Sequence, residues 1–170
     1  MVYDRRVLPS VEFRIMTPEG TASATTEEIF SGRNAILFGV VGAFMPACHY
    51  HHLPGFIEKR DRLTALGIDL VACTATNDIF VLDEWAKATD AQGKILFLSD
   101  GNGDFARMMG LLTDIRDYGL GVRSRRFAMW VVDLAIRALH VEPDPDRADF
   151  TSAKAMIRVI ENARSGSYDA

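Results

Sequence analysis

The segment GAFMPACHYHHLPGF, residues 42–56, joins an apolar run to a stretch with helical spacing, and it carries Cys48 ahead of three histidines. The preceding run, AILFGVV (35–41), is continuous and apolar, as expected for a central strand covered on both faces. After the segment, apolar residues recur at helical spacing as far as Leu66, and Gly67 offers a C-terminal cap. Cys48 is therefore predicted where a buried strand gives way to a helix. Its role is open among buried packing residue, metal ligand and nucleophile.

The rest of the chain alternates strand-like and helix-like segments. The expected strands are VEFRIM (11–16), IDLVACTA (68–75), KILFLSD (94–100), RFAMWVVD (126–133) and AIRALHVE (135–142), with PEGTAS as turn residues after the first. The expected helices are NDIFVLDEWAKATD (77–90), DFARMMGLL (104–112) and a last one from near Thr151. Pro54 is expected to kink the helix after Cys48 or restrict its first turns. Strands alternating with helices and closed by a hairpin and a final helix predict a three-layer α/β domain spanning residues 1–170.

Composition narrows the class of protein and its partners. The chain has 170 residues, of which 48% are hydrophobic, so it can bury a core as one domain without a metal or disulfide staple. The net charge of -4 argues against nucleic-acid binding. No apolar run is long enough for a membrane span, and the N-terminus lacks the apolar core of a signal peptide. We expect a cytoplasmic protein without nucleic-acid or membrane partners, whose two cysteines are free thiols.

A metal site is one alternative for the histidine-rich segment. Cys48, His49, His51 and His52 carry the donor atoms that zinc prefers. A closed zinc site usually needs four ligands in matching geometry, and the only other histidine is His140. We therefore expect no metal.

A cofactor site is the second alternative. The segment DGNGDFA (100–106) has the weak form of the dinucleotide fingerprint, G-x-G-x-x-A. The fingerprint belongs after the first strand, with an acidic residue about 20 positions later, whereas position 126 is an arginine. A turn that caps a helix is the better interpretation, and the chain has neither a Walker A loop nor a G-x-S-x-G elbow. We expect no cofactor.

The nucleophile interpretation has better physical support. The thiolate is the attacking species, and a free cysteine with a pKa of about 8.5 is only a few per cent ionised at neutral pH. A helix N-terminus stabilises an anion by about 0.3–1 kcal/mol, so a cation is also needed. The arginines of RSRRF (123–127) are the strongest candidates, on a strand that could lie beside the one leading into Cys48. The alternative is a buried, inert cysteine.

The segment around Cys48 resembles the active-site signature of the type II, or peroxiredoxin-five-like, peroxiredoxins, which reads P-G-A-F-T-P-x-C-x-x-x-H-L-P-G-F. The resemblance continues through VACTATNDIFVLDEWAKA, LSDGNGDFARMMGL, GLGVRSRRFAMWVVD and ALHVEPD, in the same order and over roughly the whole chain. It implies a thioredoxin-like fold, in which helices flank a central mixed sheet. It also implies a thiol peroxidase that reduces hydrogen peroxide and small organic hydroperoxides.

By position, the resemblance makes Cys48 the peroxidatic cysteine and Arg126 the arginine that holds the thiolate and the peroxide oxygen. Ala47 and Cys48 would supply backbone N–H groups to the peroxide, with Pro46 beside them in the pocket. His52 matches the family's histidine, in a supporting role of packing or hydrogen bonding. Cys48 would become a sulfenic acid that a thiol must reduce.

Two positions depart from the family pattern. Met45 stands where the family has a threonine, and Val41 where it has a proline. The threonine hydroxyl bonds the reacting peroxide, whereas a thioether has no donor. Losing a bond worth about 1.5–3 kcal/mol would slow the reaction roughly ten- to a hundredfold. These departures motivate a second hypothesis, a redox-sensing or thiol-binding protein with weakened peroxidase activity.

The resemblance also implies partners. The thiol that regenerates Cys48 is either Cys73 or an external donor, glutathione with glutaredoxin or thioredoxin. We favour the external donor because Cys73 ends a buried apolar strand. The resemblance further implies a homodimer formed through loops around the active site. Apolar residues near the expected loops could serve it or could cover the protein's own core: Met108, Met109, Leu111 and Leu120.

Overall fold

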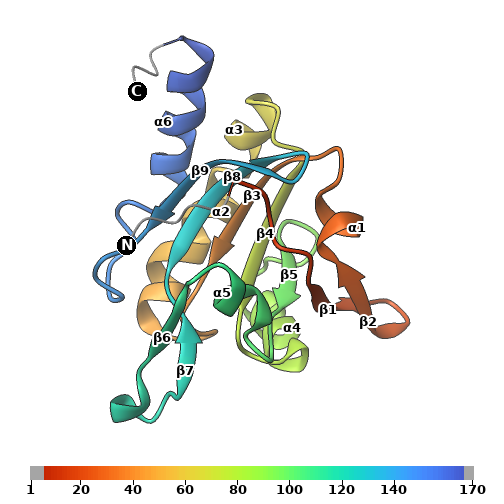
Figure 1. The fold of residues 1–170 in the computed structure, drawn as a ribbon, viewed down its shortest axis with the longest axis vertical. Helices are drawn as coiled ribbons and strands as arrows, with labels where there is room; N and C mark the ends of the chain where they lie inside the picture. Colours follow the sequence, from red (N-terminus) through yellow and green to blue (C-terminus); the bar gives the residue numbers. More distant parts are fainter. Residues whose placement is uncertain (1–5, 167–170) are drawn as a thin grey trace.

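A seven-stranded mixed sheet forms the centre of the molecule (Figure 1). The structure is a computed structural model that describes residues 6–166. The strand order is β2-β1-β5-β4-β3-β8-β9, with β3, β4 and β5 parallel and the outer strands antiparallel to their neighbours. The sheet strands are β1 (Glu12–Thr17), β2 (Gly20–Thr25), β3 (Asn34–Gly39), β4 (Leu70–Ala75), β5 (Leu96–Ser99), β8 (Phe127–Val132) and β9 (Ala135–Val141). A separate two-stranded ribbon is formed by β6 (Leu112–Asp114) and β7 (Val122–Ser124).

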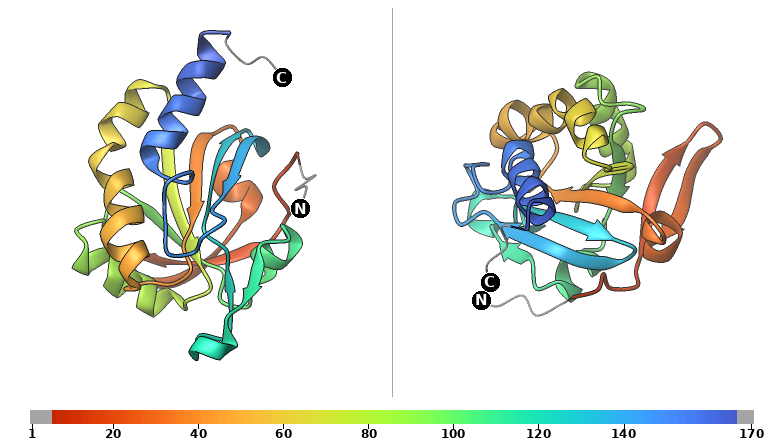
Figure 2. Two further views of the ribbon diagram at one scale, coloured as in Figure 1. Left: turned by 90° about the vertical axis from the view of Figure 1, so that its left-hand side faces the viewer. Right: turned by 90° about the horizontal axis from the view of Figure 1, so that it is seen from above.

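Helices cover both faces of this sheet (Figure 2). The helices are α1 (Thr26–Phe30), α2 (Leu53–Glu58), α3 (Arg60–Ala65), α4 (Ile79–Ala88), α5 (Asp104–Met108) and α6 (Ala153–Arg164), with a π-helical turn η1 (Cys48–His52) and a 3₁₀ turn η2 (Arg116–Tyr118). A first cluster of buried apolar side chains lies between the sheet and helices α2, α3, α4 and α6. A second cluster lies between the sheet and helices α1 and α5. The three-layer α/β arrangement predicted from the alternation of strands and helices is therefore confirmed.

Strand β3 shows why an unbroken apolar run was needed. Ile36 and Phe38 point into the first cluster, and Ala35 and Leu37 into the second, so successive side chains enter opposite cores. All four are completely buried. The prediction of a central strand covered on both faces is confirmed, and the strand leads into the loop before Cys48.

The helix predicted after Cys48 is divided into three pieces. The N–H of Leu53 donates to the carbonyl of Cys48, five residues earlier, which defines the π-helical turn. Pro54 follows in the first turn of α2, where its missing N–H is tolerated. We attribute the wider turn to Pro54, whose ring would clash with the carbonyl of Tyr50 in a regular α-helix. Lys59, with φ -91° and ψ 6°, then separates α2 from α3.

Two short elements near the N-terminus were not predicted. Residues 20–23, expected as part of a turn, open strand β2, and only residues 18–19 form the turn itself. Helix α1 follows because Thr25 and Glu28 form a capping box, in which each side chain accepts a hydrogen bond from the other residue's backbone N–H.

The helix predicted over residues 104–112 is too long. It ends at Met108, and the chain turns at Gly110, whose φ of 70° is readily adopted by glycine. Met109 and Leu111 are buried in the second cluster, whereas Met108 is 42% exposed. Of these residues, Met109 and Leu111 therefore cover the protein's own core.

No helix within residues 6–166 combines the length and apolar character needed to cross a membrane. Residues 1–5 and 167–170 of the predicted domain lie outside the described part of the chain.

Candidate active site

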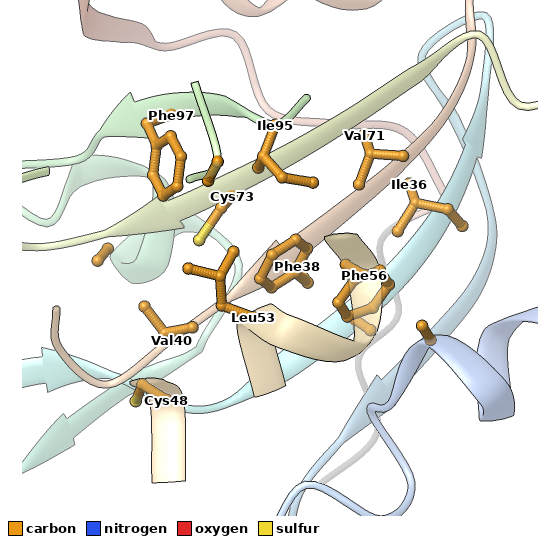
Figure 3. Close-up of a cluster of buried hydrophobic side chains, with 14 of the residues drawn as sticks. Ile36, Phe38, Val40, Cys48, Leu53, Phe56, Val71, Cys73, Ile95 and Phe97 are labelled. Carbon is orange, nitrogen blue, oxygen red and sulfur yellow. The ribbon is translucent and has the colours of Figure 1, made fainter. Parts of the chain in front are cut away.

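Cys48 lies at the beginning of the helical segment, as predicted. Its side chain is completely buried at the edge of the first cluster (Figure 3). Pro46 and Ala47 precede it in the first helical turn. Backbone N–H groups in a first turn have no intrahelical acceptor, so they offer donors and a positive dipole end to an anion formed there.

Arg126 supplies the cation beside this sulfur. Its Nη2 donates to Cys48 Sγ at 3.2 Å, and its side chain is buried. Each nitrogen of the guanidinium makes a further contact: Nη2 and Nε contact the carbonyl oxygen of Pro145 at 2.9 and 3.3 Å, and Nη1 contacts His52 Nδ1 at 3.0 Å. A guanidinium held on three sides presents its charge to the sulfur in one orientation.

His52, the last residue of η1, holds Nη1 of Arg126. Its Nε2 lies 2.9 Å from the carbonyl oxygen of Thr151, which can only accept, so Nε2 carries the proton. Its Nδ1 therefore has a free lone pair and accepts from Arg126. Burial, together with the charge of Arg126, lowers the pKa of His52 from 6.5 to about 3, although the bond to Thr151 opposes the shift. His52 is thus a neutral positioning side chain at physiological pH.

The pairing of β3 with β8 brings Arg126 to Cys48. Gly39, the last residue of β3, lies opposite Phe127, the residue after Arg126. A Cβ atom on Gly39 would lie 2.0 Å from the Phe127 ring, so only glycine leaves room for that ring. The two neighbouring strands therefore place the thiol and the guanidinium at the same end of the sheet, the arrangement that the sequence left open.

The loop before Cys48 contains the remaining predicted pocket residues. Val41 is buried, Met45 is half-buried against the first cluster, Ala47 is half-buried and Pro46 is exposed. The carbonyl of Met45 accepts the N–H of His49, which ties this loop to the helical turn.

Gly42 permits a close approach within this loop. A Cβ atom there would lie 2.8 Å from Met45 Sδ and 2.8 Å from Arg123 Nη1. The Arg123 guanidinium also donates to the carbonyls of Leu120 and Val41, at 2.7 and 3.4 Å. A second arginine of the basic segment thus holds the loop, while Arg126 contacts the sulfur.

Cys73 is a free thiol on β4, completely buried in the same cluster as Cys48. Burial raises the pKa of Cys73 well above 9.0, and the neighbouring Cys48 raises it further, while Arg126 acts in the opposite direction. Cys73 therefore stays protonated near neutral pH, which makes it a poor attacking group in this conformation.

The other histidines of the segment point to different surroundings. His49 Nδ1 accepts from Trp85 Nε1 at 2.9 Å, and its ring stacks on Phe44. His51 is exposed. Among residues 6–166, no three histidine, cysteine, aspartate or glutamate side chains gather in a way that could hold a metal ion.

The structure adds one functional segment that the sequence did not reveal. Residues 142–152, which we name the strap, connect β9 to α6 and supply the carbonyls of Pro145 and Thr151 that hold Arg126 and His52. These contacts use main-chain oxygens, which every residue has, so they could not be predicted from the pattern of side chains.

The chain is similar to known proteins in sequence and in fold. The family model described as Redoxin matches residues 6–157. Peroxiredoxin-2B of Arabidopsis thaliana is 40% identical over 137 residues, which is 75% of this chain and 85% of that protein. The crystal structure of reduced Prx3 in complex with H₂O₂ from Vibrio vulnificus matches with a TM-score of 0.88 and 35% identity, over 94% of this chain and 99% of that one. Peroxiredoxin 5 from Alvinella pompejana matches with a TM-score of 0.80 and 34% identity, over 92% and 96% of the two chains.

A free thiol held by a buried arginine on a mixed sheet flanked by helices, together with this likeness along most of the chain, places the protein in the redoxin family, among the peroxiredoxins. It is an enzyme of the thiol peroxidase class, and its fold is the thioredoxin-like fold expected from the resemblance.

Proposed function

We propose that the protein reduces hydrogen peroxide and small organic hydroperoxides through Cys48. The contact from Arg126 Nη2 to Cys48 Sγ, 3.2 Å long, carries this proposal. The Cys48 thiolate would attack one peroxide oxygen, and the O–O bond would break as the S–O bond forms. Sulfur is oxidised to the sulfenic acid, the peroxide is reduced, and the leaving oxygen takes a proton and departs as water or an alcohol.

Arg126 would stabilise the charge that moves from sulfur to the leaving oxygen. Its guanidinium is oriented before peroxide arrives, so little reorganisation is needed in the transition state. The backbone N–H groups of Ala47 and Cys48 would contact the peroxide from the helical turn. A relative of similar fold is described in complex with H₂O₂, which supports a peroxide of this size as the substrate.

An external thiol would then reduce the sulfenic acid. A first thiol forms a mixed disulfide with Cys48 and releases water, and a second thiol displaces Cys48 and leaves as a disulfide. Burial of Cys73 in the core supports glutathione with glutaredoxin, or thioredoxin, over Cys73 as the donor. The two free thiols also support our proposal of a reducing, cytoplasmic location.

The weakened, redox-sensing alternative rests on Met45 and Val41. The thioether has no hydrogen to donate, so a peroxide in this pocket would lack one donor. This alternative differs from the peroxidase in rate rather than in chemistry, and stopped-flow measurement of sulfenic acid formation separates the two. A rate no faster than that of free cysteine would refute the peroxidase.

We also propose a homodimer. Large apolar side chains are exposed in the loop before Cys48 and in α4, α5, η2 and β7. They are Phe44, Phe80, Met108, Tyr118 and Val122, exposed by 49%, 65%, 42%, 81% and 49%. A stable interface would bury roughly 1,200–2,000 Å² in total. At a protein concentration of roughly tens of micromolar, the parent protein should sediment as a dimer. A Phe80→Arg variant should sediment as a monomer. A monomeric parent protein would refute the dimer.

A further inference from the structure

We propose that Glu142 is a positioning residue for the reaction, acting on Arg126 and His52 through the strap. The inference rests on the proposed role of Cys48. Glu142 is the first residue after β9, and its side chain is 4% exposed. It does not contact the sulfur, so its effect must pass through the residues that it holds.

A single carboxylate oxygen of Glu142 closes the strap. Glu142 Oε2 accepts from the Phe150 N–H at 3.1 Å, the Thr151 N–H at 3.2 Å and the Thr151 hydroxyl at 3.0 Å. The Glu142 N–H donates to the carbonyl of Arg126 at 2.9 Å. Glu142 therefore ties both ends of the strap together beside the arginine.

The first connection to the sulfur runs through His52. Thr151 is completely buried, and two of the three donors to Glu142 Oε2 belong to this residue, whose carbonyl receives His52 Nε2–H. That carbonyl fixes the tautomer in which Nδ1 can accept from Arg126. If the carboxylate were removed, two N–H groups and a hydroxyl would lose their acceptor, at a cost of about 1–3 kcal/mol for each group that stays buried.

The second connection runs through Pro145. Its carbonyl lies within the strap and accepts two bonds from Arg126, one of them from the same Nη2 that contacts the sulfur. A strap released at Glu142 would shift this carbonyl together with that of Thr151. The two groups that hold the guanidinium, His52 and the carbonyl of Pro145, thus both depend on the side chain of Glu142. Small displacements of a catalytic group lower reaction rates strongly.

The test compares Glu142→Leu, which removes the acceptor, with Glu142→Gln, which keeps an amide oxygen as acceptor. Asp100→Leu is the matched control. Asp100 is also a buried carboxylate, and it accepts the N–H groups of Phe105 and Ala106 at 2.9 Å, away from the contacts of Cys48. Each variant is examined for sulfenic acid formation with hydrogen peroxide, for thermal unfolding, and for the ¹⁵N shifts of the His52 ring.

We expect Glu142→Leu to slow the reaction about tenfold or more, equivalent to the loss of one good hydrogen bond, and to remove the Nε2–H tautomer signature of His52. Glu142→Gln should retain both the rate and the signature. Asp100→Leu should lose thermal stability while keeping both. A folded Glu142→Leu variant with the parental rate and tautomer would overturn the proposal, as would an equal loss of rate in Asp100→Leu.

Two provisions keep the result decisive. If Glu142→Leu does not fold, Glu142→Asp keeps the charge but shortens its reach, and an unchanged rate and His52 signature would refute the positioning role. If the parent protein shows no reaction dependent on Cys48, the proposed function fails, while the His52 tautomer still reports whether Glu142 holds the strap.

Discussion

Arg126 Nη2 lies 3.2 Å from Cys48 Sγ, although the two residues are 78 positions apart in the chain. The contact is specific to a guanidinium, because the remaining nitrogens are engaged by Pro145 and His52. A lysine could supply the charge but not this set of bonds.

Replacing Arg126 by lysine should therefore slow oxidation of Cys48 by hydrogen peroxide roughly ten- to a hundredfold, as expected for the loss of a charged hydrogen bond of about 1.5–3 kcal/mol. Stopped-flow measurement of sulfenic acid formation gives the rate. Arg137→Lys, at an exposed arginine on β9, is the control and should react like the parent. Equal rates for Arg126→Lys and the parent would show that the contact does not assist the reaction.

The position of this pair could be predicted from the sequence. The apolar run of β3 indicated a central strand, and its continuation indicated a helix that begins near Cys48. The strand with the arginines could lie beside it, and β8 does pair with β3. The choice of Arg126 among these arginines came from the family resemblance. The predictions of the strand and the helix succeed because the spacing of apolar residues along the chain indicates both a strand buried on two faces and an amphipathic helix.

The supports of the pair could not be predicted in the same way. The strap holds Arg126 and His52 through main-chain carbonyls, which every residue has. Glu142 looks like a solvent-exposed charge at a strand end until its partners at residues 150 and 151 are seen. The π-helical turn was also not predicted. Pro54 indicated that the helix would be irregular, but the sequence did not indicate which kind of irregularity would form.

The pKa of His52 predicts a pH dependence of stability. The folded value of about 3 lies below the ordinary value of 6.5, so the unfolded chain binds a proton that the folded chain excludes. The free energy of unfolding is therefore unaffected by the titration of His52 above pH 6.5. Between pH 6.5 and about 3 it falls by about 1.4 kcal/mol for each pH unit, because the unfolded chain binds the proton. His52→Gln can make both hydrogen bonds without titrating. The difference in free energy of unfolding between parent and variant, measured by urea at neutral and acidic pH, should follow this slope. A constant difference would contradict it.

Cys73→Ala should leave sulfenic acid formation and turnover with an external thiol unchanged within about twofold, a change well below 1 kcal/mol. The reason is that Cys73 is buried and stays protonated. Mass spectrometry of the parent after one equivalent of peroxide should show the gain of one oxygen atom. Loss of two hydrogen atoms, with a disulfide joining Cys48 to Cys73, would instead identify Cys73 as the resolving residue.

Met45→Thr should raise the rate of peroxide reduction roughly ten- to a hundredfold, because a hydroxyl restores a donor that the thioether lacks. Met45→Leu keeps an apolar side chain of similar size without a hydroxyl and should react like the parent. If the parent is already fast and Met45→Thr leaves the rate unaltered, the pocket is not impaired, and the redox-sensing alternative loses its basis.

The central claim is that Cys48 is the peroxidatic residue, and the rate of its oxidation tests this most directly. Mixing the reduced protein with hydrogen peroxide in a stopped-flow instrument should produce a sulfenic acid on Cys48 much faster than on free cysteine. Cys48→Ser should fold normally and show no reaction. A parent rate equal to that of free cysteine, or full peroxidase turnover by Cys48→Ser, would contradict the account.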